Sequence, residues 1–256
     1  MMRLDQLLVS QGLANSRTRA QRLIRHGRIR LADNGKALVK ASEKWPEETR
    51  FDVEDDPEER YVSRAGLKLE AVLIRLQLRL DGHRVLDVGQ STGGFTDCAL
   101  SYGARHVIGV EVGHGQLASE LRGDPRVTCL EGLNARYMSS DEALKSVLAI
   151  QPIDSAIMDV SFISQTLILP EIAALLPPEG QLISLVKPQF ELNAEALDKR
   201  GVVRDASRYN DVEANIRSTC HACGFTIRHW QESPITGGDG NREFLLHAIK
   251  ECNKKT

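Results

Sequence analysis

The chain has 256 residues, of which 41% are hydrophobic and 27% are charged, and its formal net charge at pH 7 is −2. This composition is typical of a globular protein, and it excludes a chain that is disordered throughout, a collagen and a coiled coil. No apolar run approaches the roughly 18–20 residues that span a bilayer, and the N-terminal residues lack the apolar core of a signal peptide. We therefore expect a cytoplasmic protein that has no membrane partner.

The five cysteines are odd in number, which does not suit a disulfide scaffold. Cys220 and Cys223 have the spacing of a pair of metal ligands. No second cysteine pair supplies the four ligands that a zinc site usually needs. We therefore expect free thiols and no metal site.

Positive charge is concentrated at the N-terminus, where residues 1–40 contain nine basic and two acidic side chains, a net charge of +7. The rest of the chain therefore carries −9, because the total is −2. Residues 52–59 contain six acids and a proline, which predicts a solvated linker. We place an N-terminal domain at residues 1–55, an acidic linker at 56–60 and a second domain at 61–252.

The N-terminal domain is expected to contain two helices and a hairpin. Apolar side chains near the start and then Gly12 predict a short first helix. Ser16 is a suitable N-cap for a helix over residues 17–26, which Gly27 would end. Residues 28–31 alternate between basic and apolar, and the Asn-Gly dipeptide that follows at 34–35 is preferred in hairpin turns. A small α+β domain is therefore predicted.

The arginines of this domain continue from its second helix onto the hairpin. A solvated helix face would explain those on the helix alone, but guanidinium groups also suit phosphate because they form bidentate contacts. The sequence RLDQLLVSQGLANSRTRAQRLIRHGRIRL resembles the alpha-L RNA-binding domain of a small-subunit ribosomal protein. The resemblance implies binding of structured RNA, mainly through its backbone and shape. The expected contacts are Arg3, Arg17, Arg19, Arg22, Arg25, Arg28, Arg30 and Lys36.

Beyond residue 60, strand patterns and helix patterns alternate along the chain. Strands are expected at residues 84–89, 106–111, 127–130, 154–159, 181–186, 226–230 and 243–249, and helices at 95–102, 166–176 and 211–223. This alternation predicts a doubly wound, Rossmann-like α/β sheet with helices on both faces. Ligands of such sheets bind outside the carboxyl ends of the strands. Asp87, Glu111 and Asp159 lie at or next to those ends.

A glycine-rich turn at residues 89–94 joins the first strand of this domain to its helix. Glu111 lies 22 residues after Gly89, where an acid can hold ribose hydroxyls in dinucleotide sites and in S-adenosylmethionine sites. The turn departs from the dinucleotide pattern, and Asp87 stands where dinucleotide-binding folds usually carry an apolar residue. We therefore favour S-adenosylmethionine over NAD. A helix-capping role is the alternative for Asp87.

Four charged residues lie at positions where a hydrophobic core without a functional site would carry apolar side chains. Asp159 and Lys187 end two apolar strands, Glu243 begins the last strand, and Lys68 lies in the segment YVSRAGLKL. Taken singly, each is explained as a strand-end or helix-surface charge. Taken together, they resemble the Lys-Asp-Lys-Glu tetrad of the FtsJ-type RNA ribose 2′-O-methyltransferases, in that order along the chain.

Longer motifs extend this resemblance over nearly the whole chain. The segments LDVGQSTGGFTDC, GVEVGHGQL, MDVSFIS, LVKPQFE, RGVVRD and SPITGGDGNREFLL are similar to those of the TlyA family. That family joins an alpha-L head to an FtsJ-like methyltransferase, and it is labelled both rRNA methyltransferase and haemolysin. The resemblance implies S-adenosylmethionine as cofactor and ribosomal RNA or ribosomal subunits as partners. The expected cofactor contacts are Asp87, Gly89, Gly93, Gly94, Phe95, Glu111, Asn134 and Asp159.

On this resemblance we expect in-line methyl transfer to a ribose 2′-hydroxyl, with a cytidine as the expected nucleotide. Lys187 would take the hydroxyl proton, and Lys68 would be the neighbouring cation that makes Lys187 a better base. Asp159 would orient Lys187, and Glu243 would fix the lysines and the ribose. Two alternatives stay open: a non-catalytic RNA-binding or ribosome-assembly factor, and a membrane-active haemolysin. The narrow apolar stripe of the head helix does not favour the haemolysin.

Overall fold

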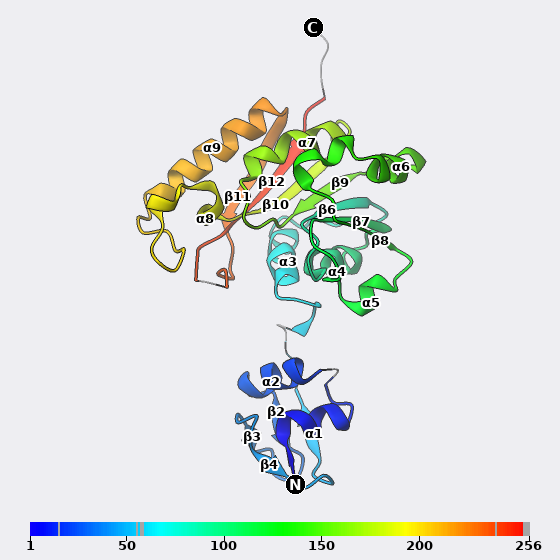
Figure 1. Cartoon of the computed structure of the whole chain (residues 1–256), viewed down its shortest axis with the longest axis vertical. Helices are drawn as coiled ribbons and strands as arrows, with labels where there is room; N and C mark the ends of the chain where they lie inside the picture. Colours follow the sequence, from blue (N-terminus) through cyan, green and yellow to red (C-terminus); the bar gives the residue numbers. More distant parts are fainter. Residues whose placement is uncertain (15, 55, 57–58, 239, 253–256) are drawn as a thin grey trace. The chain divides into compact units, whose positions relative to one another are not determined.

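The computed structural model describes residues 1–14, 16–54, 56, 59–238 and 240–252. It divides the chain into two compact units, Met1–Arg60 and Tyr61–Thr256, which we call the head and the body (Figure 1). The division falls at the end of the expected linker. Residues 57 and 58 of that linker, and Asp239 of the glycine-rich segment before Glu243, lie outside the described residues.

The head consists of two helices and short antiparallel strands. The helices are α1 (Leu4–Ser10) and α2 (Arg17–Arg25), and the strands are β1 (Met2–Arg3), β2 (Ile29–Leu31), β3 (Ala37–Leu38), β4 (Lys44–Trp45) and β5 (Phe51–Val53). Strand β2 lies between β3 and β5, and β1 pairs with β4. The predicted helices and hairpin are confirmed.

Local signals in the head sequence act as expected. The Ser16 hydroxyl accepts a hydrogen bond from the backbone N–H of Arg19 at 3.2 Å and so caps α2. The apolar side chains of both helices, including Leu7, Leu8 and Leu23, are buried together in one core. Each fully buried leucine contributes roughly 1.5–3 kcal/mol relative to an exposed one, so this small core holds the head together.

The body is built on one seven-stranded sheet in the order β11-β12-β10-β9-β6-β7-β8. Its strands are β6 (Arg84–Val88), β7 (His106–Glu111), β8 (Val127–Glu131), β9 (Ser155–Met158), β10 (Gln181–Val186), β11 (Phe225–Glu232) and β12 (Phe244–Lys250). Strands β6 to β10 are parallel, whereas β12 is antiparallel to both of its neighbours. The start of β12 therefore lies at the same edge as the carboxyl ends of the parallel strands.

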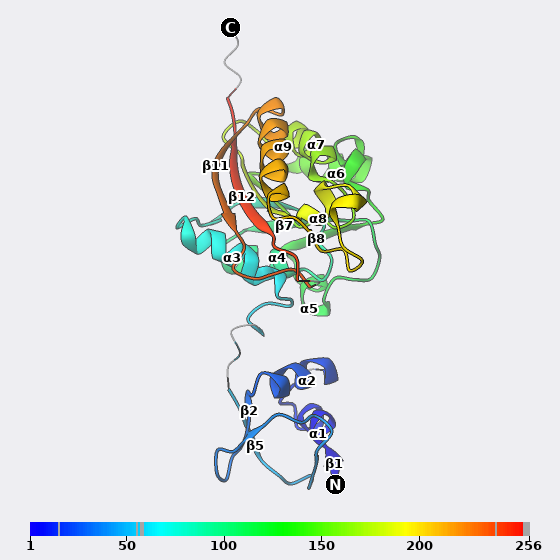
Figure 2. The same cartoon turned by 90° about the vertical axis from the view of Figure 1, so that its left-hand side faces the viewer.

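Helices cover both faces of the sheet, as Figure 1 and Figure 2 show. The helices α3 (Ala65–Arg75), α4 (Gly94–Ser101) and α5 (Ser119–Arg122) contribute to one apolar core, and α6 (Glu142–Ile150), α7 (Leu169–Leu175) and α9 (Arg208–Ala222) to the other. Val85 and Leu86, neighbours on β6, belong to opposite cores because strand side chains alternate. The predicted Rossmann-like sheet is confirmed.

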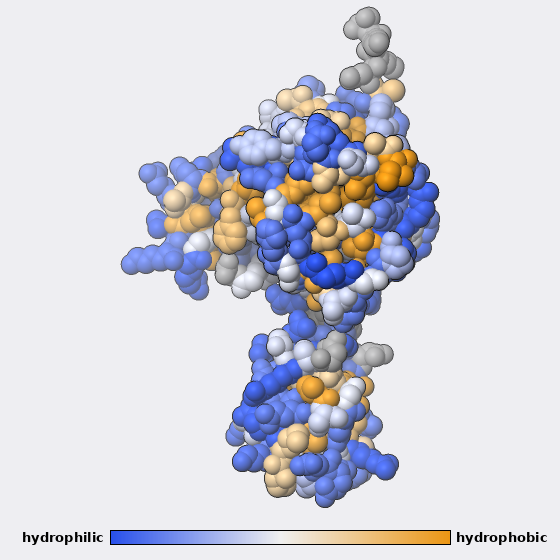
Figure 3. Space-filling view, turned by 45° about the vertical axis from the view of Figure 1, so that its right-hand side comes forward, coloured by the Kyte–Doolittle hydropathy of each residue, from blue (hydrophilic) through white to orange (hydrophobic). Residues whose placement is uncertain are grey.

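Shorter turns complete the body: α8 (Pro188–Glu191) and the 3-10 helices η2 (Ala135–Ser140), η3 (Gln165–Leu167) and η4 (Ala194–Ala196). Of these, η2, η3 and α8 follow the carboxyl ends of β8, β9 and β10. One face of the body carries a broad area of apolar surface (Figure 3). In the part of the chain that the structure describes, no helix is long and apolar enough to cross a membrane.

Candidate active site

The sheet brings the expected catalytic residues to one edge. Asp159 directly follows β9, Lys187 directly follows β10, and Glu243 directly precedes β12. The pairing of Val186 with Phe244 across β10 and β12 fixes the last two next to each other. This edge is the one at which ligands of doubly wound sheets bind.

The four charged side chains of this edge form two ion pairs. Lys187 Nζ lies 2.7 Å from Asp159 Oδ1, and Lys68 Nζ, from α3, lies 2.5 Å from Glu243 Oε2. Lys68 and Glu243 are only 9% and 3% exposed. The structure thus gives each lysine its own carboxylate, whereas we expected Glu243 to hold both.

Lys187 has a second partner, which the sequence reasoning missed. Its Nζ donates a hydrogen bond to the hydroxyl of Ser161 at 2.9 Å. Ser161 follows Asp159 by two residues in the segment MDVSFIS. That short spacing after a strand-end acid was the one sequence signal for this contact.

A cavity of about 800 Å³, which we call the cofactor cavity, opens beside these pairs. Its walls include four of the expected cofactor residues: Gly89, Glu111, Asn134 and Asp159. A Cβ atom on Gly89 would lie 2.7 Å from the carbonyl oxygen of Asp159, and the φ of Gly89 is +84°. Only glycine fits there, so the backbone of the loop after β6 runs close against the strand end that carries Asp159.

Glu111 ends β7 and holds the loops on either side of the cavity. Its Oε2 accepts the backbone N–H of Ser91 at 2.8 Å, and its Oε1 accepts that of Gly113 at 2.7 Å. A carboxylate oxygen can accept more than one hydrogen bond, so both oxygens keep capacity for ligand hydroxyls. Asn134 caps η2 by accepting the backbone N–H of Arg136 at 3.0 Å.

Of the other expected cofactor residues, some line a cavity and some do not. Gly94 and Phe95 line a small cavity of about 70 Å³ that shares Gly89 and Asp159 with the cofactor cavity. Gly93 lines neither cavity: its φ is +95°, and a Cβ there would collide with the side chains of α5 and the loop before it.

Asp87 also lines neither cavity. It is fully buried, and the Thr96 hydroxyl donates a hydrogen bond to its Oδ2 at 2.6 Å. Burial raises the pKa of Asp87 to about 7, and the nearby charges of Asp159 and Glu111 act in the same direction. The structure therefore places Asp87 beneath the glycine-rich loop, bonded to the helix that follows.

A second cavity of about 370 Å³, which we call the nucleotide cavity, shares Ser161 and Phe162 with the cofactor cavity. Lys187, Glu243, Phe162 and Phe190 are among its walls. Phe162 is 91% exposed, has a φ of +63°, and its ring centroid lies 5.1 Å from that of Phe190. An exposed aromatic ring at such a site can stack on a nucleobase. The sequence reasoning did not single out either ring.

The loops that carry Asp159 and Lys187 are joined by Glu191 at the end of α8. Its Oε2 accepts the Ser164 hydroxyl at 2.5 Å, and its Oε1 accepts the backbone N–H of Gln165 at 2.8 Å. Burial raises the pKa of Glu191, although both hydrogen bonds lower it. The loop after β9 is therefore fastened to the segment after β10.

In the head, most of the expected RNA-binding arginines already contact acids. Arg3 and Arg17 contact the buried Asp5 at 3.0 and 2.9 Å, and Arg30 contacts Glu54. Among the described residues, Arg25 and Lys36 have no ion pair, and both are exposed.

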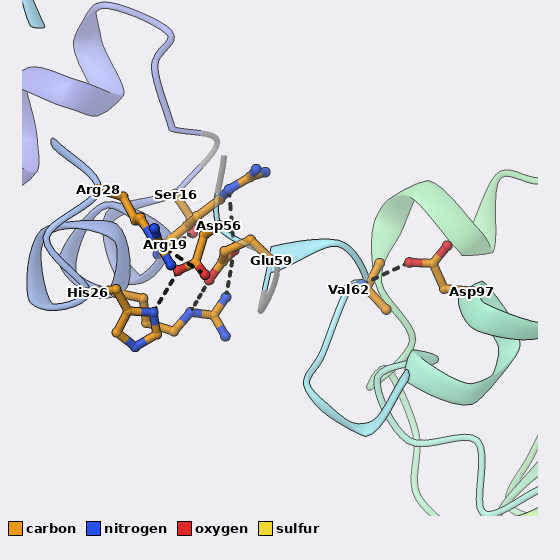
Figure 4. Close-up of polar contacts among 9 residues, drawn as sticks. Ser16, Arg19, His26, Arg28, Asp56, Glu59, Val62 and Asp97 are labelled. Atoms are coloured by element: carbon orange, nitrogen blue, oxygen red, sulfur yellow. Dashed lines mark hydrogen bonds and ion pairs between the residues drawn. The ribbon is translucent and has the colours of Figure 1, made fainter. Parts of the chain in front are cut away.

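The expectation of a solvated linker differs from the structure at Asp56 and Glu59. Their side chains are 1% and 8% exposed. Figure 4 shows Asp56 against His26 and Arg28, at 2.6 and 3.7 Å. Glu59 lies 3.4 Å from Arg19 and 2.8 Å from Arg22. Attraction between opposite charges explains the difference, because it draws these acids onto the basic head.

Two family models match the chain. Residues 61–250 match the FtsJ-like methyltransferases, and residues 2–35 match the S4 domain. The chain belongs to the TlyA family of FtsJ-like methyltransferases. It is 44% identical to Bacillus subtilis YqxC, named as a candidate rRNA methyltransferase, over 96% of this chain and 84% of that one. It is 36% identical to the 16S/23S rRNA (cytidine-2'-O)-methyltransferase TlyA of Mycobacterium tuberculosis, over 95% of this chain and 88% of that one.

A solved structure supports the same grouping. A protein from Streptococcus thermophilus, described as a candidate hemolysin, is 39% identical and superposes with a TM-score of 0.73 over 98% of this chain and 88% of that one. Members of the TlyA family thus carry both methyltransferase and hemolysin names. In this TlyA-family chain, no three His, Cys, Asp or Glu side chains among the described residues gather as ligands of a metal ion.

Proposed function

We propose that this chain transfers a methyl group from S-adenosylmethionine to the ribose 2′-hydroxyl of a cytidine in ribosomal RNA. The observation that carries the proposal is that Lys187 Nζ, from a residue that lines the nucleotide cavity, lies 2.7 Å from Asp159, which lines the cofactor cavity. The cytidine and the ribosomal RNA come from the name of the M. tuberculosis relative, which acts on 16S and 23S rRNA.

The cofactor cavity fits S-adenosylmethionine. Gly89 brings the backbone of the loop after β6 into the wall of this cavity, and Glu111 offers carboxylate oxygens to ribose hydroxyls. The volume of about 800 Å³ is within the range of small-molecule sites. We expect Asn134 to lie beside the adenine. S-adenosylmethionine, when bound, supplies an electrophilic methyl group.

The charged residues at this edge of the sheet have separate roles in the reaction. A ribose hydroxyl is a weak nucleophile, so a positioned base must take its proton as the new bond forms. Lys187, in its neutral form, is that base, and Asp159 holds its Nζ. Glu243 lines the nucleotide cavity, where its carboxylate can accept a hydrogen bond from the ribose, and Lys68 holds Glu243. Much of the rate enhancement should come from this alignment.

The nucleotide cavity and the head would bind the RNA. Phe162 is placed to stack on the base of the target nucleotide. The S4 domain of the head carries the excess of positive charge, which suits the RNA backbone. RNA binding should therefore weaken steeply as salt rises.

The test is methyl transfer from tritiated S-adenosylmethionine to naked rRNA and to each ribosomal subunit. Wild type should transfer label that resists alkaline hydrolysis of the RNA, because a 2′-O-methyl group blocks cleavage at that ribose. Lys187→Met should lose at least 100-fold in rate, since general bases contribute about 10²–10⁴-fold. Lys145→Met, which removes an exposed lysine on α6, is the matched control and should keep full activity.

Two outcomes would contradict the proposal. Transfer by Lys187→Met at the wild-type rate would remove Lys187 from the chemistry. Binding of both S-adenosylmethionine and RNA by the wild type with no transfer to any of these substrates would favour the non-catalytic RNA-binding factor.

A further inference from the structure

The two cavities of the active site share walls at Ser161 and Phe162. A methyl group donated from one cavity to an acceptor in the other must cross where the cavities meet. Ser161 is exposed, so its hydroxyl adds little to the packing of the body. That hydroxyl nevertheless has a defined partner, Lys187 Nζ, at 2.9 Å.

The two contacts of Lys187 define the direction of its free lone pair. A neutral amine has two N–H bonds and one lone pair in a tetrahedral arrangement. Ser161 Oγ accepts a hydrogen bond from Nζ at 2.9 Å, whereas Asp159 Oδ1, 2.7 Å from Nζ, forms an ion pair without hydrogen-bond geometry. With one N–H bond directed at Ser161 and the other drawn toward the charge of Asp159, the lone pair takes the remaining tetrahedral direction. Without Ser161, the amine could rotate about its last carbon–nitrogen bond and turn the lone pair away.

We propose that Ser161 is a positioning residue for methyl transfer: it fixes the rotation of the Lys187 amine so that the lone pair meets the proton of the ribose 2′-hydroxyl. The inference rests on the proposed function. In the step that it assists, the O–H bond of the ribose breaks, its proton passes to the lone pair of Nζ, and the ribose oxygen becomes bonded to the methyl carbon as the bond from that carbon to sulfur breaks.

The experiment compares Ser161→Ala and Ser161→Thr with the wild type. The alanine variant should lower kcat about tenfold, the size expected for one hydrogen bond that acts in the transition state. Its KM for RNA and its Kd for S-adenosylmethionine should change less than kcat does, because among the described residues the hydroxyl is hydrogen-bonded to Lys187 alone. The threonine variant keeps a hydroxyl and should restore most of kcat. Ser146→Ala, on the exposed face of α6, is the control.

The results distinguish failure of the inference about Ser161 from failure of the proposed function. Wild-type kcat in Ser161→Ala would overturn the inference and leave the proposed function standing. Equal losses in the alanine and threonine variants would also overturn it, because the shape of the loop would then matter and the hydroxyl would not. Absence of transfer by the wild type, under conditions where it binds S-adenosylmethionine and RNA, would overturn the proposed function and this inference together.

A second observation, in the head, concerns the choice of RNA. Asp56 forms ion pairs with His26 and Arg28, and Glu59 forms one with Arg19 (Figure 4). Glu59 forms a further ion pair with Arg22. A carboxylate and a phosphate use the same N–H donors of arginine. An RNA phosphate that contacts these arginines must therefore share or displace the carboxylates, and it meets a weaker positive potential than the arginines alone would create.

We propose that Asp56 and Glu59 are specificity-determining residues that weaken the binding of arbitrary RNA to the head. Contacts with phosphates carry no sequence information and dominate non-specific affinity. An RNA held by these phosphate contacts alone must displace the carboxylates in order to bind, and it bears the full penalty. An RNA held also by contacts elsewhere on the protein can bind with the carboxylates in place, so its affinity falls less and discrimination increases.

The test measures the binding of the full chain to an unrelated RNA duplex and to rRNA at several salt concentrations. Glu59→Gln should bind the unrelated duplex about fivefold to tenfold more tightly, and the dependence of log affinity on log salt should steepen by about one phosphate contact. Glu48→Gln makes the same charge change at an exposed head position and should alter affinity less than twofold.

Binding to the unrelated duplex should gain more from Glu59→Gln than binding to rRNA does. An equal gain for Glu48→Gln would overturn the inference, since net charge alone would then explain it. Weaker binding by Glu59→Gln would also overturn it, and would show that the acid holds its arginines in the geometry that RNA needs. A thermal melt of each variant confirms that the head is folded.

Discussion

Substitutions of the buried ion pair between Lys68 and Glu243 should affect stability and catalysis differently. Both side chains are largely shielded from water, at 9% and 3% exposure. Removing one partner of such a pair leaves an uncompensated charge in a medium of low polarity, which costs about 3–5 kcal/mol. Lys68 keeps some exposure, so Lys68→Met should destabilise the body by about 3 kcal/mol, near the lower end of this range.

For a unit of this size, 1 kcal/mol shifts Tm by about 2–4 °C, so the melting temperature should fall by roughly 6–12 °C. Glu243→Leu should have a similar effect, because it leaves the ammonium unpaired. The double variant removes both charges, and replacement of a buried pair by apolar residues is often neutral or stabilising. Its Tm should therefore return to within a few degrees of the wild type.

Differential scanning calorimetry of the full chain, combined with the methyl-transfer assay, tests this prediction. All three variants should transfer methyl groups poorly if the pair takes part in the reaction, although the double variant is stable. A cost below about 0.5 kcal/mol for either single variant would refute the reasoning, because only a solvated pair is worth so little. A double variant as unstable as the sum of the single variants would refute it as well.

Three further predictions follow from single side chains. Burial raises the pKa of Asp87 to about 7, so the unfolded chain releases this proton at lower pH than the folded chain, and stability should fall as pH rises from about 4 to 7. Asp87→Asn should lack this decline and be more stable than the wild type at pH 8 but not at pH 5, as measured by urea unfolding. Phe162→Ala should leave Tm within about 1 °C of the wild type, because the ring is 91% exposed. It should raise KM for RNA in steady-state kinetics, because the lost stacking on a base is worth about 1–3 kcal/mol. Burial raises the pKa of Asp5, but hydrogen bonds from two arginines and a glutamine bring it well below its usual value, so its stabilising effect is present at neutral pH and is lost in strong acid. Asp5→Asn should destabilise the head by about 2 kcal/mol at pH 7, as measured by unfolding monitored through the fluorescence of Trp45. An unchanged free energy of unfolding would contradict the stabilising role of the buried Asp5 carboxylate.

The fold was predictable because its signals are local. Short apolar runs located the strands of the sheet, glycines marked the ends of helices, and Ser16 marked the start of a helix. Helix α6 was missed although Asp141 caps it by accepting the backbone N–H of Leu144. Helix α3 was missed because its charged residues were read for chemistry and not for periodicity.

The four charged residues of the candidate site could be named from the sequence, but their contacts could not. Asp159 and Lys187 were found because a charge at the end of an apolar strand is conspicuous. The pairing of Lys68 with Glu243 joins residues 175 positions apart, and no local pattern encodes it. The hydrogen bond of Ser161 depends on the path of one loop. The burial of Asp56 and Glu59 depends on attraction to basic residues that are far away in the sequence. The acidic composition of the segment alone therefore suggested that it was solvated.

The measurement that tests the central claim most directly is identification of the methylated nucleoside. Ribosomal RNA from a reaction with wild-type protein would be digested to nucleosides and separated by mass spectrometry, with Lys187→Met in parallel. The account predicts 2′-O-methylcytidine in the wild-type reaction and none with the variant. A methyl group on a base, or 2′-O-methylcytidine formed equally by Lys187→Met, would contradict it.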